Sequence, residues 1–125
     1  MKLIQAPGLP APAGHYSKAV EANGFVYLSG VLPQRGAADP ASDSFDTQCA
    51  SVFDQCEQIL HAAGCGFSDV VQCTAYIVGV ANWPLFNAIY ARRFGVHKPA
   101  RAVVPVPELH HGFSVEVQMV AVAKP

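Results

Sequence analysis

The segment "SFDTQCASVFDQCEQILHAA", residues 44–63, places the strongest constraint on the fold. Its apolar side chains recur every three or four residues, which is the spacing of one face of an α-helix. They are Phe45, Cys49, Val52, Phe53, Cys56, Ile59, Leu60 and Ala63. Gly64 and Gly66 follow directly and predict the end of the helix, because glycine readily adopts the backbone conformations found there. A helix with one apolar face needs a surface to pack against.

The segments on both sides of this helix have the composition of β-strands. "SKAVEANGFVYLSG", residues 17–30, predicts two strands joined at Asn23-Gly24, a dipeptide typical of tight hairpin turns. Residues 68–80, "SDVVQCTAYIVGV", are rich in β-branched and aromatic side chains and predict a third strand. Residues 113–123, "FSVEVQMVAVA", alternate between two faces. One face is Val115, Val117, Met119 and Ala121, and the other is Glu116, Gln118, Val120 and Val122.

A second helix is predicted over residues 83–94, "WPLFNAIYARRF". Asn82 is its expected N-cap, and Pro84 lies in the first turn, where proline is tolerated. Gly95 is expected to end it. The side chains expected on its buried face are Trp83, Phe86, Ile89, Tyr90 and Phe94.

The remaining segments complete the predicted architecture. Residues 31–43 read as a loop, and residues 101–106 as a short strand ended by Pro105 and Pro107. The order hairpin, helix, strand, helix, strand, strand predicts an α+β fold, a mixed sheet with two helices packed on one face. The other face of the sheet would be uncovered and partly apolar. Because only 14% of the residues are charged, we expect another subunit to cover it.

Composition restricts the classes of function. With 125 residues, the chain is expected to be one domain spanning residues 1–125. The net charge is −1 and there is no lysine and arginine cluster, which argues against nucleic acid as a partner. No apolar run is long enough to span a bilayer, and the start of the chain lacks the apolar core of a signal peptide. We therefore expect a cytoplasmic protein with no membrane partner.

The four cysteines do not form a metal-binding pattern. Cys49 and Cys56 are two helical turns apart, Cys65 and Cys73 are further separated, and no C-x-x-C motif is present. His110 and His111 are adjacent and do not have the i, i+4 spacing of a chelating helical pair. We expect buried, reduced thiols and no metal.

Two charged residues stand in apolar surroundings. Arg101 begins the run that continues to Val106, and Glu116 lies between two valines of the last strand. Arg101 taken alone reads as a surface cation at a strand end, and Glu116 as a solvated strand position. If the strands 101–106 and 113–123 are neighbours, however, the two side chains share a face. A guanidinium then binds a substrate carboxylate through two parallel hydrogen bonds, and a nearby carboxylate acts as a base or positions water.

Five segments together resemble the reactive intermediate deaminase family, also called the Rid or YjgF family, over nearly the whole chain. "GHYSKAV", residues 14–20, is similar to the family's Gly-Pro-Tyr-Ser-Gln-Ala-Val, and "VYLSGVLP", residues 26–33, to a strand ending in Ser-Gly-x-x-Pro. "FNAIYARRFG", residues 86–95, resembles the Asn-x-x-Tyr-x-x-Phe-Phe helix. "KPARAVVPVPEL", residues 98–109, resembles the Pro-Ala-Arg segment, and "VEVQMVAV", residues 115–122, the Val-Glu-Ile-Glu-Ala-Ile-Ala strand.

The resemblance implies a homotrimer of chorismate-mutase-like subunits with active clefts between subunits. It implies hydrolysis of 2-imino acids to 2-keto acids and ammonia, without a cofactor, because an imine is already electrophilic. Arg101 would hold the substrate carboxylate, Glu116 would handle water and protons, and Tyr16 would be a third catalytic residue. The residues expected to line the cleft are Ser29, Gly30, Asn87, Ala102 and Val103.

The chain also departs from the family pattern. Val103 stands where many members have cysteine, and the loop "ELHHGF" lacks the family's Leu-Pro. His15 replaces proline, Lys18 replaces glutamine, and Gln118 replaces a second glutamate. Two other readings stay open: a specialised pathway deaminase of the aminomuconate or aminoacrylate type, and a non-catalytic trimer that binds small acids as a regulator or chaperone. Ribonuclease activity, attached to some members, is disfavoured by the net charge.

Overall fold

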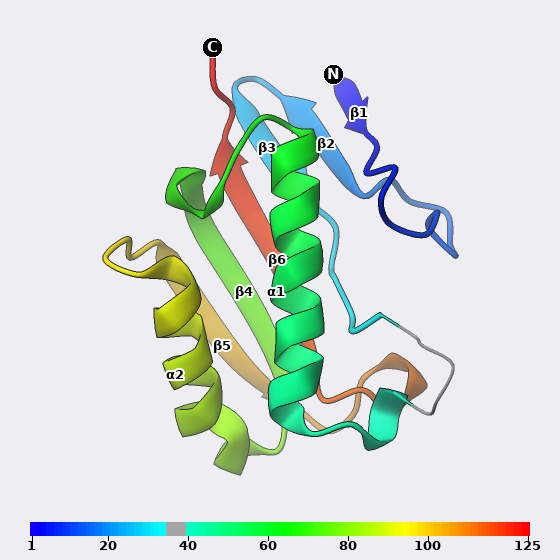
Figure 1. The fold of residues 1–125 in the computed structure, drawn as a ribbon, viewed down its shortest axis with the longest axis vertical. Helices are drawn as coiled ribbons and strands as arrows, with labels where there is room; N and C mark the ends of the chain where they lie inside the picture. The colour runs from blue at the N-terminus through cyan, green and yellow to red at the C-terminus, as the bar shows by residue number, and fades with distance from the viewer. Residues whose placement is uncertain (35–39) are drawn as a thin grey trace.

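The structure is a computed structural model that describes residues 1–34 and 40–125. A six-stranded sheet has both α-helices on one face (Figure 1), as the order of segments predicts. The strands are β1 (Lys2–Ile4), β2 (Ala19–Ala22), β3 (Phe25–Leu28), β4 (Val70–Val78), β5 (Ala100–Val106) and β6 (Val115–Val122), and the helices are α1 (Phe45–Ala62) and α2 (Trp83–Phe94). Residues 35–39 of the expected loop lie outside the described residues. The predicted α+β fold class is confirmed.

The predicted hairpin is present. β2 and β3 pair antiparallel across Asn23 and Gly24, which have φ of 53° and 84°, respectively. Two positive φ values in succession suit a tight turn between twisted strands, and asparagine and glycine tolerate them best. β1, which pairs with β2, was not predicted, because three residues followed by a proline-rich segment carry no strand pattern.

Helix α1 begins and ends where its sequence indicates. The Ser44 hydroxyl accepts a hydrogen bond from the Thr47 N–H at 3.2 Å, and Gly64 after the helix has a φ of 78°. The apolar stripe is buried together with two glutamines. The Gln48 Oε1 accepts a hydrogen bond from the Ser114 N–H at 2.8 Å, and the Gln55 Nε2 donates one to the Leu32 carbonyl at 2.9 Å. Both glutamines therefore pair with backbone groups of loop residues.

Helix α2 has the predicted bounds, with two local differences. The Asn82 side chain makes no capping bond, and its Nδ2 donates instead to the Val78 carbonyl at 3.0 Å. Trp83 was expected in the core, but its side chain is 37% exposed. Trp83 is the first residue of the helix, one turn before Phe86, whose ring stacks on Phe53 of α1. The other four apolar residues of its predicted face are buried.

The strand order differs from the sequence prediction at one decisive point. β5 pairs in parallel with β4, and β6 lies between β3 and β4, so residues 101–106 and 113–123 are not neighbours. Pro105 lies within β5 and does not end it. A proline cannot donate to a strand ladder, which suits an edge strand such as β5. β6 has the alternation predicted for it, with one face buried under the helices.

Among residues 1–34 and 40–125, no helix covers the sheet face opposite α1 and α2, as predicted. Large apolar side chains exposed on it are Leu3, Phe25, Tyr27, Val104 and Val122. Over residues 1–34 and 40–125, neither helix is both long and apolar enough to cross a membrane.

The packing of Phe53 leads to a stability prediction. This fully buried ring contacts the aromatic rings of Phe67, Phe86, Tyr90 and Phe94, and so joins α1 to α2. Phe53→Ala should lower the free energy of unfolding by about 3–5 kcal/mol, because it leaves a cavity at the centre of this cluster.

Urea denaturation at one fixed protein concentration measures the change, and Leu85→Ala, at a 38% exposed position of α2, is the control. The control should lose less than about 1 kcal/mol. Equal losses in the two variants would contradict the central role of Phe53.

Candidate functional site

Arg101 lies beside α2, on the helix side of the sheet. Its register partner on β4 is Cys73, which is buried, so Arg101 lies on the same, helix-covered face of the sheet. Its Nη1 donates to Asn87 Oδ1 at 2.9 Å, and its guanidinium carbon lies 4.9 Å from the centre of the Tyr90 ring. Neither ion pair found among the described residues involves Arg101. The guanidinium is therefore oriented by an amide and a ring while its charge stays available to an anion.

Tyr90 is a site residue that sequence reasoning assigned only to the core. Its hydroxyl is buried and has no hydrogen-bond partner in the described part of the chain. Burial raises the pKa of Tyr90, and the neighbouring Cys73 raises it further. Tyr90 is thus a neutral aromatic surface under the guanidinium. A hollow of about 260 Å³ adjoins it, lined also by His97, Lys98 and Pro99.

Glu116 lies on the opposite, uncovered face of the sheet. Its register partner on β4 is Tyr76, three residues beyond Cys73. A Cβ atom at Gly30 would stand 2.6 Å from Glu116 Oε2, so only glycine leaves room for this carboxylate. Burial raises the pKa of Glu116 above its ordinary value, and the charge of His110 opposes the shift. His110 is also a neighbour of Glu116. The sequence did not predict this, because His110 was considered there only as a metal ligand together with His111.

Tyr16, Ser29 and Gly30 line a second hollow of about 270 Å³, together with Lys18. Ser29, directly after β3, is hydrogen-bonded to the segment directly before β2. Its hydroxyl donates to the Ser17 carbonyl at 2.7 Å, and its N–H donates to the Lys18 carbonyl at 3.0 Å. Ser29 therefore holds the segment that carries Tyr16 and has only acceptor capacity left for a ligand.

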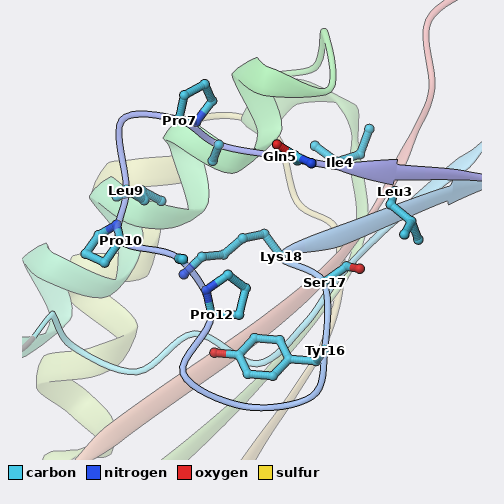
Figure 2. A pocket seen from close by; sticks show the side chains of 12 residues that line it. Leu3, Ile4, Gln5, Pro7, Leu9, Pro10, Pro12, Tyr16, Ser17 and Lys18 are labelled. Carbon is cyan, nitrogen blue, oxygen red and sulfur yellow. The ribbon is translucent and has the colours of Figure 1, made fainter.

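The N-terminal segment encloses a third hollow, of about 400 Å³, beside the second (Figure 2). The two hollows share four lining residues, Pro10, Ala11, Tyr16 and Lys18. Tyr16 is half-exposed, and its ring is accessible from this region.

The predicted site residues thus fall into two separate groups. We call Arg101, Asn87 and Tyr90 the arginine half-site, and Glu116, Gly30, Tyr16 and Ser29 the glutamate half-site. Arg101 and Glu116 lie on opposite faces, and their strands are two positions apart, about 10 Å at ordinary strand spacing. The prediction that they share a face, which depended on neighbouring strands, is therefore wrong. One small substrate cannot contact both within a single chain.

The two remaining predicted residues are divided between the faces of β5. Val103 has the buried Ala75 as its register partner and is half-buried on the helix side with Arg101. Ala102 is exposed, and its partner Thr74 places it on the uncovered face with Glu116. β5 is the last strand of the sheet, so its outer edge has no strand partner within residues 1–34 and 40–125.

The four thiols are free and buried. Burial raises the pKa of Cys49 and of Cys73 to about 12 and also raises the pKa values of Cys56 and Cys65. Such thiols stay protonated and unreactive near neutral pH. In the described part of the chain, no three histidine, cysteine or acidic side chains come together in a group that could hold a metal ion.

Known proteins share both sequence and fold with this chain. The profile of the family described as Endoribonuclease L-PSP matches residues 6–123. A RutC family protein of Aquifex aeolicus is 36% identical over 124 residues, covering 98% of this chain and 99% of that protein. Reactive Intermediate Deaminase A, chloroplastic, of Arabidopsis thaliana is 33% identical over 123 residues, covering 96% of this chain and 65% of that protein.

Among solved structures, E. coli TdcF with bound serine superposes with a TM-score of 0.88 at 25% identity, covering 99% of this chain and 100% of that one. The sequence match extends over almost every described element, and the structural match over the complete sheet and both helices. The chain therefore belongs to the Endoribonuclease L-PSP family, the reactive intermediate deaminase (Rid or YjgF) family that its motifs resemble.

Proposed function

We propose that this protein hydrolyses 2-imino acids at sites formed between two subunits. Membership of the family, with a relative named as a reactive intermediate deaminase, supports a deaminase of reactive intermediates. The observation that carries the finer proposal is the separation of the arginine half-site from the glutamate half-site on opposite faces of one chain. A second copy is needed to bring an Arg101 to a Glu116.

The proposed reaction is R–C(=NH)–COO⁻ + H₂O → R–CO–COO⁻ + NH₃. The Arg101 guanidinium binds the carboxylate through two hydrogen bonds, and its contacts with Asn87 and Tyr90 hold it in the required orientation. Placing a positive charge beside the carboxylate also favours attack on the neighbouring imine carbon, since the carboxylate no longer repels the incoming electron pair.

Glu116 takes a proton from the attacking water and passes it to the nitrogen that leaves as ammonia. Its raised pKa suits this exchange, because a carboxyl group nearer to neutral pH both accepts and returns a proton readily. Tyr16 and Ser29 line the hollow that Gly30 also lines, and Gly30 lies against the Glu116 carboxylate, so these residues orient the imine and the water beside it. No cofactor is needed, as the bond that breaks is already polarised.

The proposed partners are two further copies of this chain, forming a homotrimer. The uncovered sheet face carries five large exposed apolar side chains, and burying such a face is favourable. The edge of β5 beside Arg101 offers an adjoining surface. An RNA-cleaving function, which the family description names, lacks electrostatic support in a chain with a net charge of −1.

Substitutions at Arg101 and Glu116 test the assignment of roles. Arg101→Ala should lower the rate of imine hydrolysis about a hundredfold, through the loss of a charge-assisted two-point contact. Arg101→Lys should be nearly as damaging, because an ammonium cannot make the planar contact. Glu116→Gln should reduce turnover more than it reduces the binding of a stable 2-keto acid.

Hydrolysis of an imine generated in situ from alanine by an amino-acid oxidase gives the rates, and calorimetry with a 2-keto acid gives the binding. Wild-type turnover by a folded Arg101→Ala oligomer would show that Arg101 is only a surface cation.

Mixing two inactive variants tests whether the site lies between subunits. In oligomers assembled at random from equal amounts of Arg101→Ala and Glu116→Gln chains, about one quarter of the sites combine an intact Arg101 with an intact Glu116. Activity should therefore return to about one quarter of the wild-type value. Sedimentation of the wild type should show a trimer at micromolar concentration. A stable monomer, or a mixture as inactive as its components, would contradict the proposed site.

The close approach of Gly30 to Glu116 gives a pH prediction. Gly30→Ala places a methyl group where the carboxylate lies and should push it toward water, which lowers its raised pKa. If Glu116 is the base, the acidic limb of the kcat/KM profile should move to lower pH and the maximal rate should fall.

Gly66→Ala is the matched control, because a Cβ atom there meets nothing within 4 Å and its φ is −140°. An unchanged pH profile in Gly30→Ala would remove Glu116 from the proton transfer.

A further inference from the structure

Lys18 is the charged side chain of the glutamate half-site region that the proposed reaction does not use. It lines both of the adjoining hollows, together with Tyr16. Figure 2 shows its side chain extending toward Pro10 and Pro12, inside the turn made by the N-terminal segment. Proline, alanine and leucine side chains make up much of this lining, and they offer an ammonium group no hydrogen-bond acceptor.

The ammonium of Lys18 has no counter-charge in the described part of the chain. The two ion pairs found there join Arg93 to Asp54 and Lys124 to Asp69. Lys18 is half-buried, so water screens its charge only in part. An unpaired, partly dehydrated cation in the wall of a hollow favours an anionic ligand.

The backbone at Lys18 is held in place. Its carbonyl accepts the Ser29 N–H at 3.0 Å, and the next residue, Ala19, pairs with Leu28 in the β2–β3 ladder. The direction from which the side chain enters the hollow is therefore set by the hairpin. A fixed cation near Tyr16 and Gly30 stands in the opposite half-site from Arg101.

We propose that Lys18 determines specificity by binding a second carboxylate of the substrate. This inference rests on the proposed function: Arg101 of one subunit holds the carboxylate next to the imine, and Lys18 of the other holds the distal one. The preferred substrates are then 2-imino dicarboxylic acids, hydrolysed to 2-keto dicarboxylic acids and ammonia. The same water and the same Glu116 serve the reaction.

The test compares the imines of aspartate and leucine, which have branched side chains of similar shape but differ in charge. Both are generated in situ by amino-acid oxidases, and the measured quantity is the ratio of kcat/KM for the aspartate imine to that for the leucine imine. The wild type should favour the aspartate imine. Lys18→Met should lower the ratio about tenfold or more, through the loss of one charge-assisted hydrogen bond.

Two variants serve as controls. Lys18→Arg retains the positive charge and should keep most of the preference. Lys2→Met removes an exposed lysine on β1 and should leave the ratio unchanged. An unchanged ratio in Lys18→Met would overturn the inference. A ratio lowered instead by Lys98→Met would also overturn it, since the distal carboxylate would then lie in the hollow beside Arg101.

A binding measurement separates this inference from the proposed function. Calorimetry compares 2-oxoglutarate with 2-oxobutyrate, which lacks the distal carboxylate. Tighter binding of 2-oxoglutarate, lost in Lys18→Met, would support the Lys18 site even if no imine were hydrolysed and the deaminase proposal failed. Hydrolysis of both imines at equal rates, with equal binding of both keto acids, would leave the deaminase proposal standing and remove the role of Lys18.

Discussion

The insertion of β6 between β3 and β4 is the constraint on which the rest of the structure depends. β6 is antiparallel to both neighbours, and its alternate residues are buried beneath the helices. The intervening residues therefore face the other way, which puts Glu116 on the uncovered side against Gly30. Because β4 then pairs on its other side with β5, Arg101 lies on the outermost strand of the sheet. Both half-sites follow from this one placement.

Each half-site includes or adjoins a cation that has no ion-pair partner in the described part of the chain. Arg101 has an amide and an aromatic ring as neighbours but no carboxylate, and Lys18 has no ion-pair partner. In the glutamate half-site, Glu116 is partly buried against Gly30, and the charge of His110 opposes the effect of burial on its pKa. Lys18 and Glu116 are partly buried without an ion-pair partner in the described part of the chain, which lowers the stability of the isolated subunit. In the proposed function, an anionic substrate between two subunits pairs with the cations Arg101 and Lys18. The proposed function therefore links ligand binding to assembly.

The parts of the fold that were predictable have a local physical cause. The periodicity of α1 and the glycines that follow it predicted the helix closely, and the Asn23-Gly24 dipeptide predicted the hairpin. The residues that were mispredicted lie where the deciding contact is remote. Trp83 has the spacing of a core residue, but it is the first residue of α2 and stays 37% exposed. β1 has too few residues to show a sequence pattern, and it forms because its backbone pairs antiparallel with β2.

The sequence alone identified Arg101 and Glu116 as residues with suitable chemistry, and it predicted the buried stripe of α1 and the alternating faces of β6. Those properties depend on side-chain type and on backbone periodicities of 3.6 and 2 residues, which are local. Only the tertiary structure decided that Arg101 and Glu116 lie apart. Strand order is a competition among pairings of segments distant in the chain, and a short connection between β5 and β6 does not make them neighbours. β6, with one fully buried face, gains more from the central position than β5 does, since β5 carries a proline that suits an edge.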